Sequence, residues 1–169
     1  MEVDFLFQIG DKIVYPMYGA GVIETIEEKE ILGEKQQYFL IKMQIGDLQL
    51  MVPVGKISNL GIRLAVDVPT LENTLLIFHD SESAPSLSWN QRYRMNMDKM
   101  RTGDIQDGAE VIRDLLHRKK EKTLNTSEAR MLHNAWQILI SELALVKGCT
   151  ENQANDVLNK EVNSVEMYL

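Results

Sequence analysis

The feature that most constrains the fold is a change in hydrophobic pattern near Pro53. Before it, Val, Ile, Tyr and Phe recur in short runs of strand length, separated by Gly- and Pro-containing turns. After it, apolar residues recur at the i, i+3, i+4 spacing of amphipathic helices. Strands followed by helices, without alternation, predict an α+β protein rather than a series of βαβ units. We place the domain boundary so that residues 1–67 form a β domain and residues 68–169 a compact all-α domain.

The first domain contains four strand candidates with hairpin-like punctuation. Short strands at this spacing predict a small antiparallel β-barrel. Glutamates alternate loosely with isoleucines over residues 23–31, so one face of that long hairpin arm is expected to be exposed to solvent. The predicted strands are 12–16, 21–26, 36–43 and 48–53.

The second domain carries recognisable helix start and stop signals. Ser88, Asp104 and Asn125 are placed to cap successive helices, and Glu128 completes a capping-box pattern with Asn125. Gly103 is placed to end the first of the three. The predicted helices are 70–80, 88–101, 105–121, 126–147 and 150–162, with a loop at 81–86.

Composition argues against several functional classes. Cys149 is the only cysteine, which excludes an intramolecular disulfide and a cysteine metal cluster. The three histidines share no metal-type spacing, and no catalytic motif is recognisable. No apolar run is long enough to cross a bilayer, and the acidic N-terminus does not resemble a secretory signal. We therefore expect a cytoplasmic protein that is not an enzyme and uses no metal or cofactor.

The net charge of −7 argues against nucleic-acid binding, but the charge is unevenly distributed. Residues 89–130 contain ten basic and seven acidic residues, and the densest basic run is HRKKEK at 117–122. A solvated helix face explains this excess as well as a binding surface does.

The segment LSWNQRYRMN, residues 87–96, raises a sharper question. Trp136 lies among Leu and Ile at helical spacing and is predicted to be in the core. Trp89 has Arg92 and Tyr93 at i+3 and i+4 instead of an aliphatic pair. Periodicity alone leaves two alternatives open, a half-buried packing residue or an exposed functional ring.

Several segments of the chain resemble the CarD family of bacterial transcription regulators. In the first domain these are IGDKIVYPMYGAGVIETIEEKEILGEKQQYFLIKM and GDLQLMVP; in the second they are SWNQRYRMNMDKMRTGDI, EVIRDL, LNTSEARML and QILISELAL. Together they span about residues 8–147, and their order and spacing are specific to the family. The first domain resembles the RNA-polymerase-interacting domain that also occurs in transcription-repair coupling factors.

The resemblance implies a Tudor-like antiparallel β-barrel that binds the β subunit of RNA polymerase. The helical domain is then expected to contact promoter DNA in the minor groove at the upstream edge of the bubble, largely without sequence specificity. The implied function is stabilisation of the open complex, without a cofactor, a metal or a membrane. We expect a monomer in the cytoplasm, associated with the nucleoid through the polymerase.

The resemblance also assigns residues to DNA binding. The family's wedge tryptophan corresponds to Trp89, and its neighbouring phosphate-binding cations correspond to Arg92 and Arg94. A further family lysine corresponds to Ala129, so that cation is absent. Arg130 is adjacent but points in a different direction on a helix.

On the polymerase side, the resemblance assigns Lys29 and Met51. Lys29 keeps the positive charge of the family position but lacks the bidentate guanidinium fork. Met51 stands where other members carry arginine, which makes an apolar contact the expectation at that position.

Two alternative functions are a protein–protein adaptor and an enzyme that acts on nucleic acid. A protein–protein adaptor on RNA polymerase would use Trp89 as an interface anchor without touching DNA. An enzyme acting on nucleic acid would need an acid/base or metal constellation, and the sequence offers none.

Overall fold

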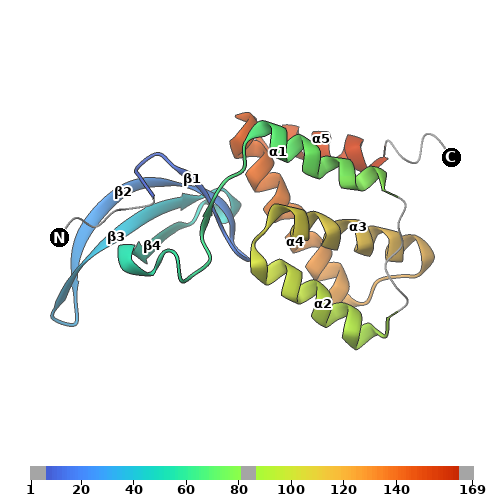
Figure 1. The fold of residues 1–169 in the computed structure, drawn as a ribbon, viewed down its shortest axis with the longest axis horizontal. Coiled ribbons are helices and arrows are strands. Elements are labelled where there is room, and N and C mark those ends of the chain that lie inside the picture. Colours follow the sequence, from blue (N-terminus) through green and yellow to red (C-terminus); the bar gives the residue numbers. More distant parts are fainter. Residues whose placement is uncertain (1–6, 81–86, 164–169) are drawn as a thin grey trace.

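The computed structural model describes residues 7–80 and 87–163. A twisted sheet forms one end of the molecule and the helices form the other (Figure 1). The α+β prediction, with strands first and helices second, is confirmed.

The sheet has five strands in the order β4-β3-β2-β1-β5, and all its pairings are antiparallel. The strands are β1 (Lys12–Tyr15), β2 (Gly19–Ile31), β3 (Glu34–Met43), β4 (Gln49–Pro53) and β5 (Arg63–Leu64), with 3₁₀ turns η1 (Ile45–Asp47) and η2 (Val54–Lys56). Among the described residues no pairing joins β4 to β5, so the Tudor-like sheet is curved but not closed. The sequence did not predict β5, because its two residues become a strand only by pairing with β1.

One face of the sheet is buried under apolar residues, but only near the centre of the sheet. Its core consists of Phe7, Ile13, Ile23, Phe39, Ile41, Met43, Val52, Ile57 and Ile62. A register shift between Ile23 and Thr25 marks a bulge in β2, and the β2–β3 arm continues beyond it. Residues 27–37 of the arm are exposed on both faces. The expectation of one wet face was therefore too narrow, because no other element covers this part of the arm.

The helices begin and end where local capping signals place them. They are α1 (Val68–Leu75), α2 (Trp89–Thr102), α3 (Ile105–Glu121), α4 (Thr126–Lys147) and α5 (Glu151–Asn163). The helix predicted over 70–80 divides into α1 and a tighter 3₁₀ segment, η3 (Leu76–His79). The loop predicted at 81–86 lies outside the described residues. No helix in the described ranges is long and apolar enough to span a membrane.

All five helices and η3 contribute to a second core, separate from that of the sheet. Its fully buried members include Leu71, Val111, Ile112, Leu115, Leu143 and Leu158. Trp136 is only partly buried against this core, which corrects the prediction of a core residue. Its indole Nε1–H donates to Asn155 Oδ1 of α5 at 2.8 Å, so the polar edge of the ring keeps it at the margin.

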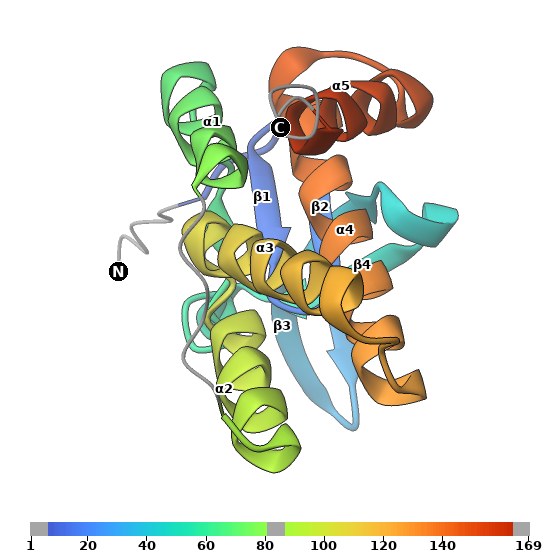
Figure 2. The same ribbon diagram turned by 90° about the vertical axis from the view of Figure 1, so that its right-hand side faces the viewer.

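The two parts meet where the β1–β2 turn packs against α4. Figure 2 shows α4 crossing in front of the sheet. The Ala20 N–H donates to Ser141 Oγ at 2.9 Å, a buried hydrogen bond between β2 and the middle of α4. Val14 and Ala20 are both buried here, although they lie on the face of the sheet opposite its own core.

Candidate functional sites

Trp89 stands in the first turn of α2, at a firmly fixed helix start. Ser88 Oγ accepts from the Gln91 N–H, and Gln91 Oε1 accepts from the Ser88 N–H, forming a complete capping box. The indole is 43% exposed and stacks on Tyr93, with ring centroids 5.5 Å apart and planes inclined by 23°. Because Tyr93 itself packs against the helical core, it holds the indole in place while much of the indole remains open to solvent.

Arg92 has a different environment from the one its DNA-binding assignment implies. Its Nε and one terminal nitrogen donate to the two oxygens of Glu128 at 2.8 and 2.9 Å. The other terminal nitrogen donates to the Leu87 carbonyl at 3.3 Å. The Arg92 side chain is 14% exposed and that of Glu128 only 3%, so the pair is largely removed from water. The hydrogen bonds that Arg92 donates to the Glu128 carboxylate raise the pKa of Arg92.

The Arg92–Glu128 pair joins the first turn of α2 to the first turn of α4. Asn125 caps α4 as predicted, since its side-chain oxygen accepts from the Glu128 N–H at 2.8 Å. The Glu128 carboxylate is directed to Arg92 and to the Asn125 side-chain amide instead of the Asn125 backbone N–H, so only the Asn125 half of the predicted capping box is formed among the described residues. This arrangement fixes the position of the helix start that carries Trp89.

Arg94 is the exposed cation of this segment. It lies two residues beyond Arg92, which places the two side chains about 200° apart around the helix. Within residues 7–80 and 87–163 no ion pair or hydrogen bond engages the Arg94 guanidinium. Arg94 is therefore available to an external anion, whereas Arg92 would have to share its donors with Glu128.

The position of the missing family lysine lies at a groove between α3 and α4. Exposed Ala129 lines it together with Lys119 of α3 and His133 of α4. The groove has a volume of about 590 Å³, and Leu116, Leu124, Leu132 and Trp136 form its apolar part. A cation is thus present near Ala129, but it comes from the HRKKEK run on another helix.

Lys29 and Met51 occupy the sheet. Lys29 lies on the exposed arm of β2, where its ammonium is 3.7 Å from the Glu27 carboxylate. Met51 lies on β4, an edge strand, and is 41% exposed. Met51 pairs with Leu40 and Lys29 with Gln36, four residues away on β3, so both side chains are on the same face of the sheet. This face is opposite the one that carries Phe39.

The structure brings the predicted residues together in two groups. Trp89, Arg92 and Arg94 share the start of α2, while Lys29 and Met51 share one face of the sheet. The arm and the start of α2 lie at opposite ends of the molecule (Figure 1). Sequence reasoning missed the supporting roles of Tyr93 and Glu128. The aromatic pair at i, i+4 in the sequence indicated the role of Tyr93, but no local pattern indicated that Glu128 binds Arg92.

No group of three or more His, Cys, Asp and Glu side chains in the described part of the chain is arranged to hold a metal ion.

Comparison with known proteins matches both parts of the chain to family models. Residues 7–65 match the CarD-like/TRCF RID domain, and residues 73–159 match the CarD C-terminal domain. The "Putative transcription factor YdeB" of Bacillus subtilis (strain 168) is 55% identical over 148 residues, which cover 88% of this chain and 97% of that protein. A 72-residue N-terminal domain of Myxococcus xanthus CarD, solved by NMR, is 28% identical over 37% of this chain and 84% of that domain, with a TM-score of 0.31.

An RID-type β domain followed by a helical C-terminal domain defines a CarD-type transcription regulator. The chain belongs to the CarD family.

Proposed function

We propose that this regulator binds the β subunit of RNA polymerase through its sheet and contacts promoter DNA through the start of α2. The DNA contact lies at the upstream edge of the bubble, in the minor groove, and prolongs the life of the open complex. In this proposal Trp89 and Arg94 contact DNA directly. Arg92 stays a predicted phosphate contact, and its hydrogen bonds to Glu128 also make it the residue that holds the helix start in place.

The observation that carries the DNA half of this proposal is the half-exposed indole of Trp89. An apolar ring inserted beside a base step must offset the free-energy cost of unstacking the bases. A rigidly held ring does this better, because a mobile ring would also lose conformational entropy on binding. The capping box and the stack on Tyr93 provide that rigidity. Arg94 adds a phosphate contact that fixes position without reading sequence.

The polymerase half rests on the exposed face and edge of the sheet. An edge strand such as β4 can pair with a strand of a partner, and the backbone hydrogen bonds then give affinity whatever the side chains are. Met51 supports an apolar contact beside that edge, and Lys29 supports a single-point ionic contact on the same face.

The net charge of −7 agrees with a DNA contact that depends on the polymerase. The few cations near Trp89 give little affinity for free duplex, but tethering raises their local concentration at the promoter. The proposal includes a monomeric regulator that reaches the nucleoid only through the polymerase.

The experiment that tests the DNA half measures the lifetime of promoter open complexes with the full-length variant Trp89→Ala. Losing a stacked ring costs about 1–3 kcal/mol, so the lifetime should fall about tenfold. Trp89→Phe keeps an aromatic wedge and should retain part of the effect. If folded Trp89→Ala protein at a saturating concentration leaves the lifetime unchanged, the proposal that Trp89 acts as a wedge is refuted.

A second candidate is an adaptor that binds another protein through the same ring. Exposed aromatic pairs backed by the core are also typical of interface hot spots, and Trp89 and Tyr93 form such a pair. A photocrosslinker placed at Asn90 in a polymerase–promoter complex separates the two functions. Label on promoter DNA supports the wedge, whereas label on protein alone supports the adaptor.

A further inference from the structure

The contact between sheet and helices is built from directional interactions around Arg63 and Glu142. Arg63 lies on β5, and both of its terminal nitrogens donate to the Glu142 carboxylate at 2.8 Å. The same carboxylate accepts from the Val66 N–H at 3.0 Å. Glu142 is 1% exposed, so it depends entirely on partners from the segment that connects the sheet to α1.

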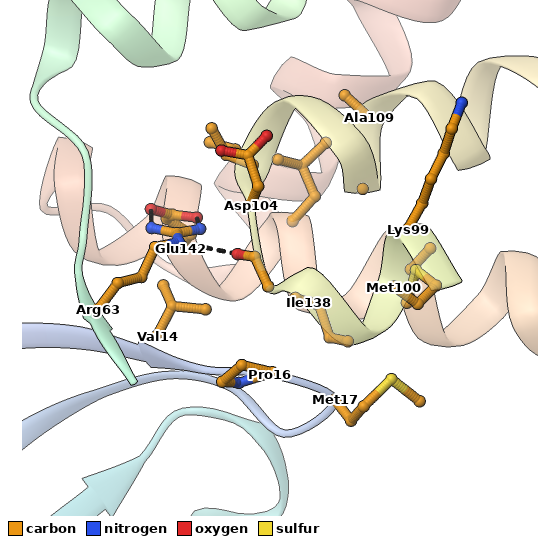
Figure 3. Close-up of a pocket in the computed structure, with 15 residues that line it drawn as sticks. Val14, Pro16, Met17, Arg63, Lys99, Met100, Asp104, Ala109, Ile138 and Glu142 are labelled. Carbon is orange, nitrogen blue, oxygen red and sulfur yellow. Dashed lines mark hydrogen bonds and ion pairs between the residues drawn. The ribbon is translucent and has the colours of Figure 1, made fainter. Parts of the chain in front are cut away.

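Arg63 also reaches the junction between α2 and α3. Its Nε donates to the Gly103 carbonyl at 2.8 Å. One guanidinium on the sheet therefore binds the end of α2 and the C-terminal half of α4 at once, as Figure 3 shows for Arg63 and Glu142. A bidentate guanidinium–carboxylate pair fixes orientation as well as distance.

Two glycines at this contact leave no room for a side chain. A Cβ on Gly103 would lie 2.7 Å from Pro16 Cγ of the β1–β2 turn. A Cβ on Gly19 would lie 2.9 Å from Ser141 Oγ of α4 and 2.7 Å from Ile45 Cδ1. The cavity that remains between the two parts is only about 30 Å³, enough for one water molecule. The contact is therefore closely packed and specific in geometry.

We infer that Arg63, Glu142 and Gly103 form an interdomain clamp that makes the sheet and the helical domain one rigid body. A buried ion pair contributes little net stability compared with apolar residues, so its strongest effect here is to select one relative orientation. Without such a clamp, domains joined by a short segment move relative to one another. Arg63 and Glu142 are then positioning residues for Trp89, which they never touch.

The consequence for transcription rests on the proposed function. If the sheet is bound to the polymerase, a rigid clamp delivers the start of α2 to one place on the promoter. A loosened clamp spreads Trp89 over many positions and lowers its effective concentration at the base step. Clamp variants should then bind polymerase normally but lose most of the gain in open-complex lifetime.

The clamp is tested by distance measurements on the isolated full chain, independently of polymerase and DNA. In a Cys149→Ser background, spin labels at the exposed positions Gln37 and Gln106 report the separation of sheet and helices. Arg63→Ala should roughly double the width of the distance distribution, as expected for domains released to move. An equally narrow distribution in a folded Arg63→Ala protein overturns the inference.

Gly103→Ala and Gly148→Ala form a matched pair. Both glycines end a helix in the left-handed conformation, with φ of 72° and 65°, so alanine strains the backbone at both positions. Only Gly103 faces the sheet, since nothing lies within 4 Å of a Cβ on Gly148. Gly103→Ala should broaden the distribution and Gly148→Ala should not; broadening by both would overturn the clamp.

If Arg63→Ala fails to fold because Glu142 is left buried and unpaired, the double variant Arg63→Met/Glu142→Leu replaces the pair with apolar residues. It should fold, as circular dichroism would verify, and still broaden the distribution because the bonds to Gly103 and Val66 are gone. A narrow distribution in this double variant overturns the inference. A broad distribution with an unchanged open-complex lifetime would sustain the clamp and contradict the proposed function instead.

Discussion

At the scale of single residues, neighbouring cations with the same assignment have unlike surroundings. Arg92 and Arg94 are two positions apart, yet Arg92 is largely buried against Glu128 and Arg94 is exposed at the surface. The difference follows from the helix rotation between them, which turns one toward α4 and the other toward solvent. The basic character of a segment therefore does not tell which cation reaches phosphate.

The two arginines should separate in stability measurements. Arg92→Ala leaves the Glu128 carboxylate buried without its main partner, and the free energy of unfolding should fall by about 3 kcal/mol. Arg94→Ala removes an exposed side chain that has no ion pair or hydrogen bond within the described ranges, and should change it by less than about 0.5 kcal/mol. Urea denaturation monitored by circular dichroism measures both values. Equal effects of the two substitutions would contradict the buried-pair interpretation.

Arg94 should instead be detected in the salt dependence of the DNA contact. Removing one phosphate contact lowers the slope of the logarithm of complex stability against the logarithm of salt concentration by about 1. Open-complex lifetimes measured with wild type and Arg94→Ala across a salt series give this slope. Asn90→Ala, one turn earlier on the same face of α2, is the matched control and should leave the slope unchanged. The same slope for wild type and Arg94→Ala would exclude Arg94 as a phosphate contact.

At the scale of elements, the parts that sequence predicts well are those determined locally. The predicted starts of α3 and α4 agree with the structure, because Asp104 and Asn125 cap them through hydrogen bonds to backbone N–H groups only three residues away. The strand β5 was missed because it forms only by pairing with β1, about fifty residues earlier in the chain. Contacts between distant segments also limit the prediction of the sites. The resemblance identified Trp89, but not that Glu128 of α4 binds Arg92 and so holds the helix start that carries Trp89.

The start of α1 gives a prediction on pH. Asp67 caps this helix by accepting from the Thr70 N–H at 2.8 Å. The hydrogen bond from the Thr70 side chain, and after it the bond from this N–H, lower the pKa of Asp67 below its ordinary value of 3.8. A carboxyl whose pKa is lower in the folded state contributes its full stabilisation at pH values above its pKa in the unfolded chain. That contribution is lost as the pH falls through the lowered folded value.

Asp67→Asn keeps a capping oxygen but removes the titration, so it provides the comparison. The melting temperature of wild type should exceed that of Asp67→Asn at neutral pH, and the difference should shrink as the pH falls below about 4. Thermal melts from about pH 6 to about pH 2 test this. A difference that stays constant over this range would mean that the Asp67 charge does not stabilise α1.

At the scale of the whole molecule, the surface proposed for the polymerase and the surface proposed for DNA lie at opposite ends of a single packed body (Figure 1). In the proposed function, the sheet sets how much regulator is bound to the polymerase, and the start of α2 sets what a bound molecule does to the promoter. Because the two effects multiply, they are separable by titration: affinity for polymerase shifts the concentration at half-maximal effect, and the DNA contact sets the plateau.

Met51→Arg tests this separation, since it restores the guanidinium that other members of the family were expected to carry. A charge-assisted hydrogen bond contributes about 1.5–3 kcal/mol, so the concentration for half-maximal open-complex lifetime should fall about tenfold or more. The plateau should stay at the wild-type value because the start of α2 is untouched. Trp89→Ala should do the reverse, lowering the plateau while leaving the half-maximal concentration in place. A Met51→Arg protein that changes the plateau alone would place Met51 outside the polymerase contact, and the sheet face shared with Lys29 would then need another partner.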